Sequence, residues 1–264
     1  MNPRIGLFIV SLTFTILVSA QEWEVIDTIS LNERISTYSI DNQNQLYLGT
    51  TSGNLFRYDE TGDQSEFYSA IANFKLTSVE AWNRMKVFLF YRNPQEYYFL
   101  DRFNTLSNSY DISDYSAELV YKCTPGIDNS LWVLTSSYNE LRKYNLQTKQ
   151  LLFANPLDID VKNITHIRAY RNLLLISDRE AGLYIFDQFG NLLTELPYTN
   201  IDHFQIKSGR LLFKCAEGVV SLDPFNPRDT KTTKAPEGAF TGMLVGDSLY
   251  FFMQKDRALV FRQL

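Results

Sequence analysis

The stretch NLLLISDREAGLYIFD, residues 172–187, holds two apolar runs on either side of a polar turn. The runs 173–176 and 183–186 consist of aliphatic and aromatic residues, which favour β-strands. The segment between them, 178–182, contains the Asp and Gly that tight turns need. Neither run shows the 3.6-residue periodicity of an amphipathic helix. This stretch therefore predicts a β-hairpin.

Five further copies of the same pattern occur in the chain. They are QLYLGTTSGNLFRYD (45–59), KVFLFYRNPQEYYFLD (86–101), SLWVLTSSYNELRKYN (130–145), RLLFKCAEGVVSLD (210–223) and SLYFFMQKDRALVF (248–261). The first apolar residues of the six copies are separated by 41, 44, 42, 38 and 38 residues. A period near 40 with strand content alone is typical of propeller blades, whereas helical repeats would show helical periodicity.

Flanking strands complete each repeat as a four-stranded blade, whose strands we name A (innermost) to D (outermost). The A strands that precede the copies are ISTYSID, LTSVEAW, LVYKC, THIRAY, DHFQIK and FTGMLV. The last copy has no D strand after it, but the segment EWEVIDTISL (22–31) is a spare strand near the other end. Circular closure would pair the two and leave no open sheet edge. We predict an all-β, six-bladed β-propeller whose last blade is closed by the N-terminal strand.

The fourth copy carries a family resemblance. Its apolar strand, Asp178, second apolar strand and Phe186-Asp187-Gln188-Phe189-Gly190 resemble an NHL-type repeat. The Gly-His and Trp-Asp marks of WD repeats are missing from the chain. The resemblance implies a six-bladed propeller of a type that often binds proteins, nucleic acids or small ligands, and it transfers no function by itself.

The N-terminal segment predicts export. Residues 5–18 are almost wholly apolar and end in Val18-Ser19-Ala20, the small-x-small pattern that signal peptidase cleaves. We therefore assign residues 1–20 to a signal peptide and residues 21–264 to one propeller domain, periplasmic or secreted. The mature chain has no stretch long enough for a transmembrane helix. The cleavage junction resembles those of exported Bacteroidota proteins.

Charge and cysteine content narrow the function classes. The formal net charge is −5, with Lys and Arg scattered along the chain, so we predict no nucleic-acid partner. The two cysteines, Cys123 and Cys215, fall in blades three and five, which are not adjacent. A disulfide tolerates roughly 7 Å between Cα atoms, so we predict two buried free thiols.

The central channel is where chemistry would occur, because the A strands line it. We expect Glu80, Lys122, His166 and His203 to face the channel, with the two histidine rings as neighbours. A metal site would need further ligands, so we predict neither a metal nor another cofactor. Calcium-dependent propeller lactonases are an alternative, although one channel carboxylate is few for Ca²⁺. The chain also has no nucleophile elbow or phosphate-binding loop, which favours a non-enzymatic role.

The B–C and D–A turns form one face of the ring, which we call the top face. The residues that we expect to bind a partner there are Arg34, Lys75, Tyr91, Arg92, Tyr138, Arg179, Lys255 and Arg257. Arg and Tyr often anchor protein interfaces, and loops on a rigid scaffold often carry function. We therefore interpret the chain as a scaffold that docks a protein in a cell-envelope or extracellular complex. The alternative is a channel-based hydrolase or small-molecule sensor.

A second candidate surface is the long segment 104–115. Tyr110, Ile112 and Tyr115 would be exposed there if the segment were an open loop. The other interpretation is a D strand followed by a long return turn.

Overall fold

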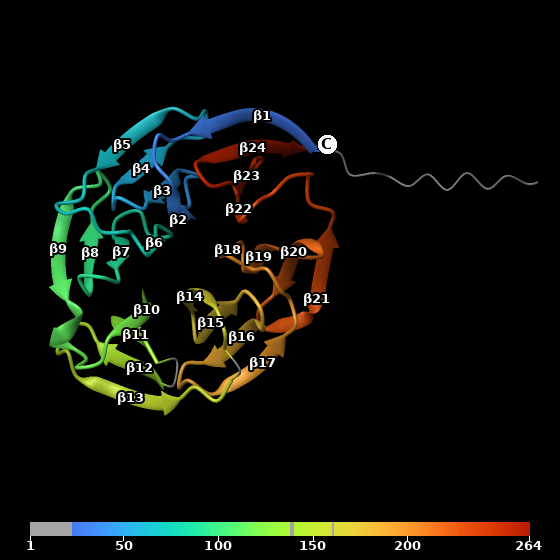
Figure 1. The fold of residues 1–264 in the computed structure, drawn as a ribbon. Coiled ribbons are helices and arrows are strands. Elements are labelled where there is room, and N and C mark those ends of the chain that lie inside the picture. Colours follow the sequence, from blue (N-terminus) through green and yellow to red (C-terminus); the bar gives the residue numbers. More distant parts are fainter. Residues whose placement is uncertain (1–22, 138–139, 160) are drawn as a thin grey trace, which may run out of the picture.

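The structure, a computed structural model, describes residues 23–137, 140–159 and 161–264. It contains six four-stranded antiparallel sheets arranged in a ring (Figure 1). The predicted six-bladed β-propeller is thus confirmed. The predicted signal peptide, residues 1–20, and the candidate Tyr138 lie outside the described residues.

In the first five blades the strands follow the chain outward, and the last blade takes its outer strand from the N-terminal side. The inner strands are β2 (Ile35–Ile40), β6 (Ser78–Glu80), β10 (Val120–Pro125), β14 (Ile164–Tyr170), β18 (Phe204–Lys207) and β22 (Gly242–Val245). The second strands are β3 (Leu46–Thr50), β7 (Val87–Tyr91), β11 (Ser130–Thr135), β15 (Leu173–Asp178), β19 (Arg210–Cys215) and β23 (Tyr250–Met253). The third strands are β4 (Leu55–Tyr58), β8 (Glu96–Leu100), β12 (Glu140–Asn145), β16 (Gly182–Asp187), β20 (Gly218–Asp223) and β24 (Arg257–Gln263). The outer strands are β5 (Gln64–Tyr68), β9 (Leu106–Asp111), β13 (Leu151–Pro156), β17 (Leu192–Leu196), β21 (Asn226–Thr233) and β1 (Trp23–Ser30).

The two ends of the described chain meet in the last blade. Strand β1 pairs antiparallel with β24, from Trp23 opposite Gln263 to Ser30 opposite Arg257. The Trp23 ring packs edge-on against Tyr250, with 4.9 Å between the ring centroids. These contacts confirm closure by the N-terminal strand.

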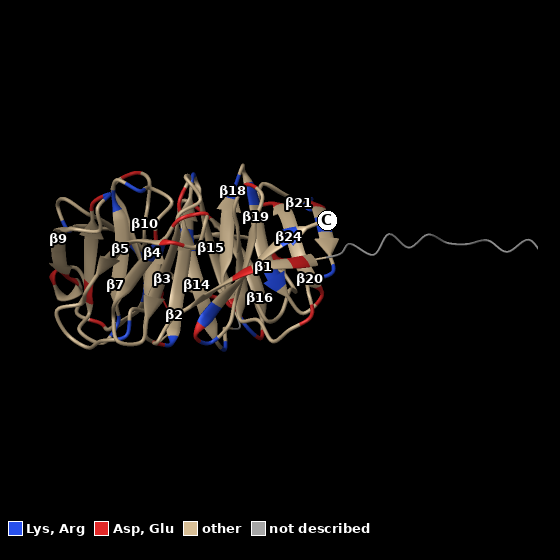
Figure 2. Cartoon of the chain, turned by 90° about the horizontal axis from the view of Figure 1, so that it is seen from above, with Lys and Arg blue, Asp and Glu red and all other residues tan. Residues whose placement is uncertain are grey.

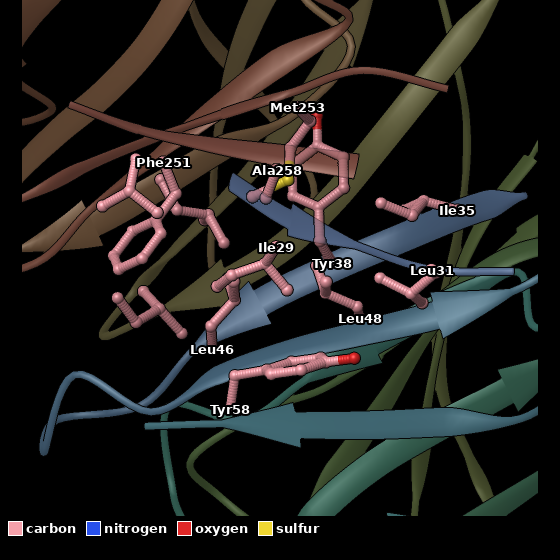
Figure 3. Close-up of a cluster of buried hydrophobic side chains, with 13 residues drawn as sticks. Ile29, Leu31, Ile35, Tyr38, Leu46, Leu48, Tyr58, Phe251, Met253 and Ala258 are labelled. Atoms are coloured by element: carbon pink, nitrogen blue, oxygen red, sulfur yellow. The ribbon is translucent and has the colours of Figure 1, made fainter. Parts of the chain in front are cut away.

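The core lies between neighbouring blades. Figure 3 shows one such cluster, in which Tyr38 and Leu48 of the first blade meet Phe251 and Met253 of the last blade. The inner part of each sheet is covered on both faces by the neighbouring blades, so the sequence of the strands there is a nearly continuous apolar run. Every residue of β7 is buried for this reason.

Aspartates at the end of third strands explain the repeated final Asp in the sequence pattern. The Asp187 carboxylate accepts hydrogen bonds from the backbone N–H groups of Phe189 (2.8 Å) and Asn191 (2.9 Å). Asp101 accepts from Phe103 in the same way, at 2.8 Å. The side chain thus stabilises the turn that leads to the outer strand.

The segment 104–115 is not an open loop. It forms the outer strand β9 and then a short 3₁₀ helix, η1 (Ile112–Asp114). Ile112 and Tyr115 are buried, and the Tyr110 ring stacks on Tyr97 at 4.9 Å. The interpretation as a D strand with a return turn is therefore the right one.

Both cysteines are buried and free, as predicted. No helix in the described ranges is long and apolar enough to cross a membrane.

Candidate functional site

Hydrogen bonds between blades fix the rim of the top face. The pairing of the inner and second strands shifts by one residue at Ser36, Tyr121 and Thr165, near the start of three inner strands. Each of these residues uses its hydroxyl to donate to a carbonyl at the entrance to the next blade. The bonds are Ser36 Oγ to Leu76 O (2.7 Å), Tyr121 Oη to Ile164 O (3.2 Å) and Thr165 Oγ1 to Ile201 O (2.7 Å). The irregular positions therefore join adjacent blades.

Deeper in the ring, polar side chains form hydrogen bonds with backbone groups of the inner strands of neighbouring blades. The Val79 N–H donates to Thr37 Oγ1 at 3.3 Å. The Gln205 amide donates to Val245 O at 2.9 Å and accepts from Val245 N at 2.7 Å. Buried backbone groups need such partners, so these polar side chains have a structural role.

A cavity of about 600 Å³ opens at the top of the channel. Its charged lining residues are Arg34, Lys75, Arg92, Lys122, Arg179 and Asp202. The cavity thus gathers five cationic side chains and one carboxylate from the described residues, on a protein with a net charge of −5. Figure 2 shows the ring edge-on, with charged residues in the turns on both of its faces.

The two histidines contact each other at this cavity. The ring centroids of His166 and His203 are 4.1 Å apart, and Tyr38 lies 4.7 Å from His203. Burial lowers the pKa of His203 to about 3 and holds the pKa of His166 well below its usual range. Both rings are therefore neutral at pH 7. The described chain contains no group of three or more His, Cys, Asp or Glu side chains that could hold a metal ion.

Tyr38 occupies the channel beside this pair because position 242 is a glycine. A Cβ atom at Gly242 would lie 1.9 Å from the Tyr38 hydroxyl. Burial raises the pKa of the Tyr38 phenol well above its usual range, so the ring stays neutral. Tyr38 and the two histidines are thus uncharged lining residues of the cavity, in contrast to the charged residues at its rim.

The cations of the cavity differ in their partners. Arg179 donates from Nε to the Asp202 carboxylate at 2.7 Å, and the Arg92 guanidinium lies 4.2 Å from the Tyr121 ring centroid. Lys122 forms no ion pair within the described ranges. Burial lowers the pKa of Lys122 to about 8, and the nearby charges of Lys75 and Arg92 act in the same direction.

Glu80 is separate from the other expected channel residues. It ends β6 and lines a smaller cavity of about 170 Å³ together with turn residues such as Trp82 and Gly126. The side chain is only 3% exposed, and neither carboxylate oxygen has a hydrogen-bond partner in the described structure. Burial raises the pKa of Glu80 to about 7, against the opposing effects of the Arg168 charge and of the nearby polar side chains of Thr124 and Trp82.

The expected partner-binding residues are only partly brought together. Four of them line the top cavity, namely Arg34, Lys75, Arg92 and Arg179. Lys255, in the turn between β23 and β24, and Arg257, the first residue of β24, do not line the cavity. Arg257 pairs with Asp256 at 3.0 Å. The expectation that Tyr91 is exposed was wrong. Tyr91 is 3% exposed and donates to Gly53 O at 2.7 Å, because the last residue of β7 points into the preceding blade.

Exposed apolar residues on the top face were missed from the sequence. Ile71 and Phe74, in the turn between β5 and β6, are 82% and 42% exposed. They line a second cavity of about 450 Å³ beside Tyr98 and Tyr110. The signal was present as AIANF (70–74), which is unusually apolar for a turn.

Comparison with known proteins supports the fold. No family model and no curated protein matches the sequence. Among solved structures, the WD40 domain of Pan2 from Neurospora crassa is 9% identical over 93% of this chain and 96% of that chain, with a TM-score of 0.59. BamB from Moraxella catarrhalis is 13% identical over 91% of this chain and 98% of that one, with a TM-score of 0.49. The likeness to the Pan2 domain shows a β-propeller fold and no more, so the NHL-type assignment and export stay predictions.

Proposed function

We propose that this protein is a non-enzymatic, exported scaffold whose top face docks a protein partner in a cell-envelope or extracellular complex. The observation that carries the proposal is the composition of that face. Exposed Ile71 and Phe74 lie on the same turn as Lys75, which lines the cationic opening with Arg92 and Arg179.

This combination suits protein recognition. Arginine and aromatic residues supply much of the binding energy in many interfaces, and exposed apolar patches often mark interaction sites. The rim residue Ser36 bonds to the next blade at 2.7 Å. A partner would thus bind to a rigid surface, and little conformational freedom would be lost on binding.

The alternative functions use the cavity. A volume of about 600 Å³ falls within the usual range for small-molecule sites, which supports a sensor as the second candidate. A calcium-dependent hydrolase would need several oxygen ligands at one point. Glu80 lies outside this cavity, and the carboxylate among the described lining residues, Asp202, is paired with Arg179, which disfavours that alternative.

The test is a crosslinked pull-down of the tagged protein, at native level, from its own cell envelope. We expect one salt-resistant partner, and we expect the double variant Arg92→Glu with Arg179→Glu to lose it without a lower melting temperature. The matched control is Arg228→Glu with Lys231→Glu, which makes the same charge change at exposed positions of the outer strand β21. Unchanged capture by the top-face variant, or the absence of any partner, would contradict the proposal.

A further inference from the structure

The top cavity holds more positive charge than its surroundings neutralise. Of the cations that line it, Arg179 alone has a carboxylate partner, Asp202. Within the described ranges, Arg34, Lys75 and Lys122 form no ion pair. Several like charges around one cavity repel each other, and a concave site with low-dielectric walls focuses the potential that they create.

Two acidic residues that are close in sequence to these cations have other partners. Glu33 is adjacent to Arg34 in sequence, but its carboxylate accepts hydrogen bonds from Ser52 and from Asn54, the latter at 2.9 Å. Glu118, near the start of β10, pairs with Arg142 at 2.8 Å. Neither carboxylate thus neutralises the cations of the cavity.

Lys122 lies close to other cations of this group, Lys75 and Arg92. It is half-buried on β10, and its pKa is lowered by burial and by Lys75 and Arg92. His166 and His203 beside it are neutral and provide no compensating charge. An anionic ligand would supply the counter-charge that the described protein residues do not.

Two of the guanidinium groups are already held in place. Arg92 lies over the Tyr121 ring, and Arg179 is fixed by Asp202. Guanidinium groups bind carboxylate and phosphate oxygens through paired, charge-assisted hydrogen bonds. Side chains held in this way lose little conformational freedom when a ligand binds.

We infer that the top cavity binds a compact anion with two or more negative charges, carried by carboxylate or phosphate groups, with Lys122 as its central contact. A single negative charge would leave most of the repulsion among Arg34, Lys75, Arg92 and Lys122 in place. The anion is either a free small molecule or the acidic side chains of a docked protein segment. The inference goes beyond the proposed docking function and does not depend on it.

The test is calorimetric titration of the purified mature protein at physiological ionic strength. The probes are citrate, pyrophosphate and a capped hexaglutamate peptide, with acetate as the monovalent comparison. We expect at least one multivalent probe to bind more tightly than acetate, and Lys122→Met to weaken it by roughly tenfold or more, since a hydrogen bond to a charged group is lost. Lys231→Met on β21 is the matched control and should not change the affinity. If Lys122→Met does not fold, as judged by its melting curve, Arg92→Gln takes its place.

The outcomes separate the two sources. Binding of citrate or pyrophosphate supports a free anion, and binding of hexaglutamate alone supports an acidic protein segment. The inference is overturned if no multivalent probe binds more tightly than acetate, or if wild type and the cavity variant bind equally well. Citrate binding without any captured partner would overturn the docking function alone, and capture without anion binding would overturn this inference alone.

Discussion

Substitution of Glu80 by Gln should stabilise the protein at alkaline pH. Glu80 is 3% exposed, its oxygens lack hydrogen-bond partners in the described structure, and its pKa is raised from 4.5 to about 7, chiefly by burial. The favourable charge of Arg168 is already contained in that value. Gln imitates the protonated side chain, so it removes the cost of ionisation while keeping the shape.

The size and sign of the effect follow from the two pKa values. Below pH 4.5 the carboxyl is protonated in the folded and unfolded states, so its ionisation does not affect stability. Between pH 4.5 and about 7 the unfolded state ionises first, and folding loses about 1.4 kcal/mol per pH unit. Above pH 7 the full cost is about 3 kcal/mol, which corresponds to about 6–12 °C in melting temperature for a chain of this length.

The assay is thermal or urea denaturation of wild type and Glu80→Gln at several pH values from about 5 to 8. The two proteins should be nearly equal at the acidic end and diverge as pH rises, with the variant more stable. Glu195→Gln, at an exposed position of β17, is the control and should show no such divergence. A variant that is less stable than wild type at pH 8 would refute the reasoning, because it would mean that the ionised carboxylate is favourably bound.

Two further perturbations test the packing. Gly242→Ala should lower stability by about 1–3 kcal/mol through overpacking, since the new Cβ would meet the Tyr38 hydroxyl at 1.9 Å. The double variant with Tyr38→Phe should recover part of the loss in the same melting assay, and no recovery would place the clash elsewhere. Cys123 and Cys215 should resist a thiol reagent in the native protein and react only in denaturant, because both are buried and burial raises the pKa of Cys215 to about 12; rapid native labelling would contradict this packing.

The blades could be predicted because the chain repeats one sequence pattern, that of a strand buried on both faces. A strand covered on both faces is largely apolar, and β7 and the first four residues of β15 show this as uninterrupted runs. The position of the turns then follows from the topology, so Arg92 and Arg179 could be placed on the top face from their position in the B–C turns alone.

Depth and side-chain direction could not be predicted in the same way. In a strand, a shift of one residue sends a side chain to the opposite face. Tyr91, at the end of β7, points into the preceding blade, whereas Arg92, the next residue, lines the cavity. Glu80 pairs with Phe88, the second residue of β7, whereas Lys122 pairs with Leu134, the fifth residue of β11. Glu80 therefore lies deeper than Lys122 and lines the lower cavity, although both are third residues of inner strands.

The irregular pairing at Ser36, Tyr121 and Thr165 is a further reason why side-chain direction could not be predicted. An extra residue in one strand bends it and changes the direction of the side chains that follow. The shift in β10 comes directly before Lys122, and the shift in β14 comes directly before His166. The residues that join the blades through their hydroxyls thus also affect the direction of Lys122 and His166, which line the cavity.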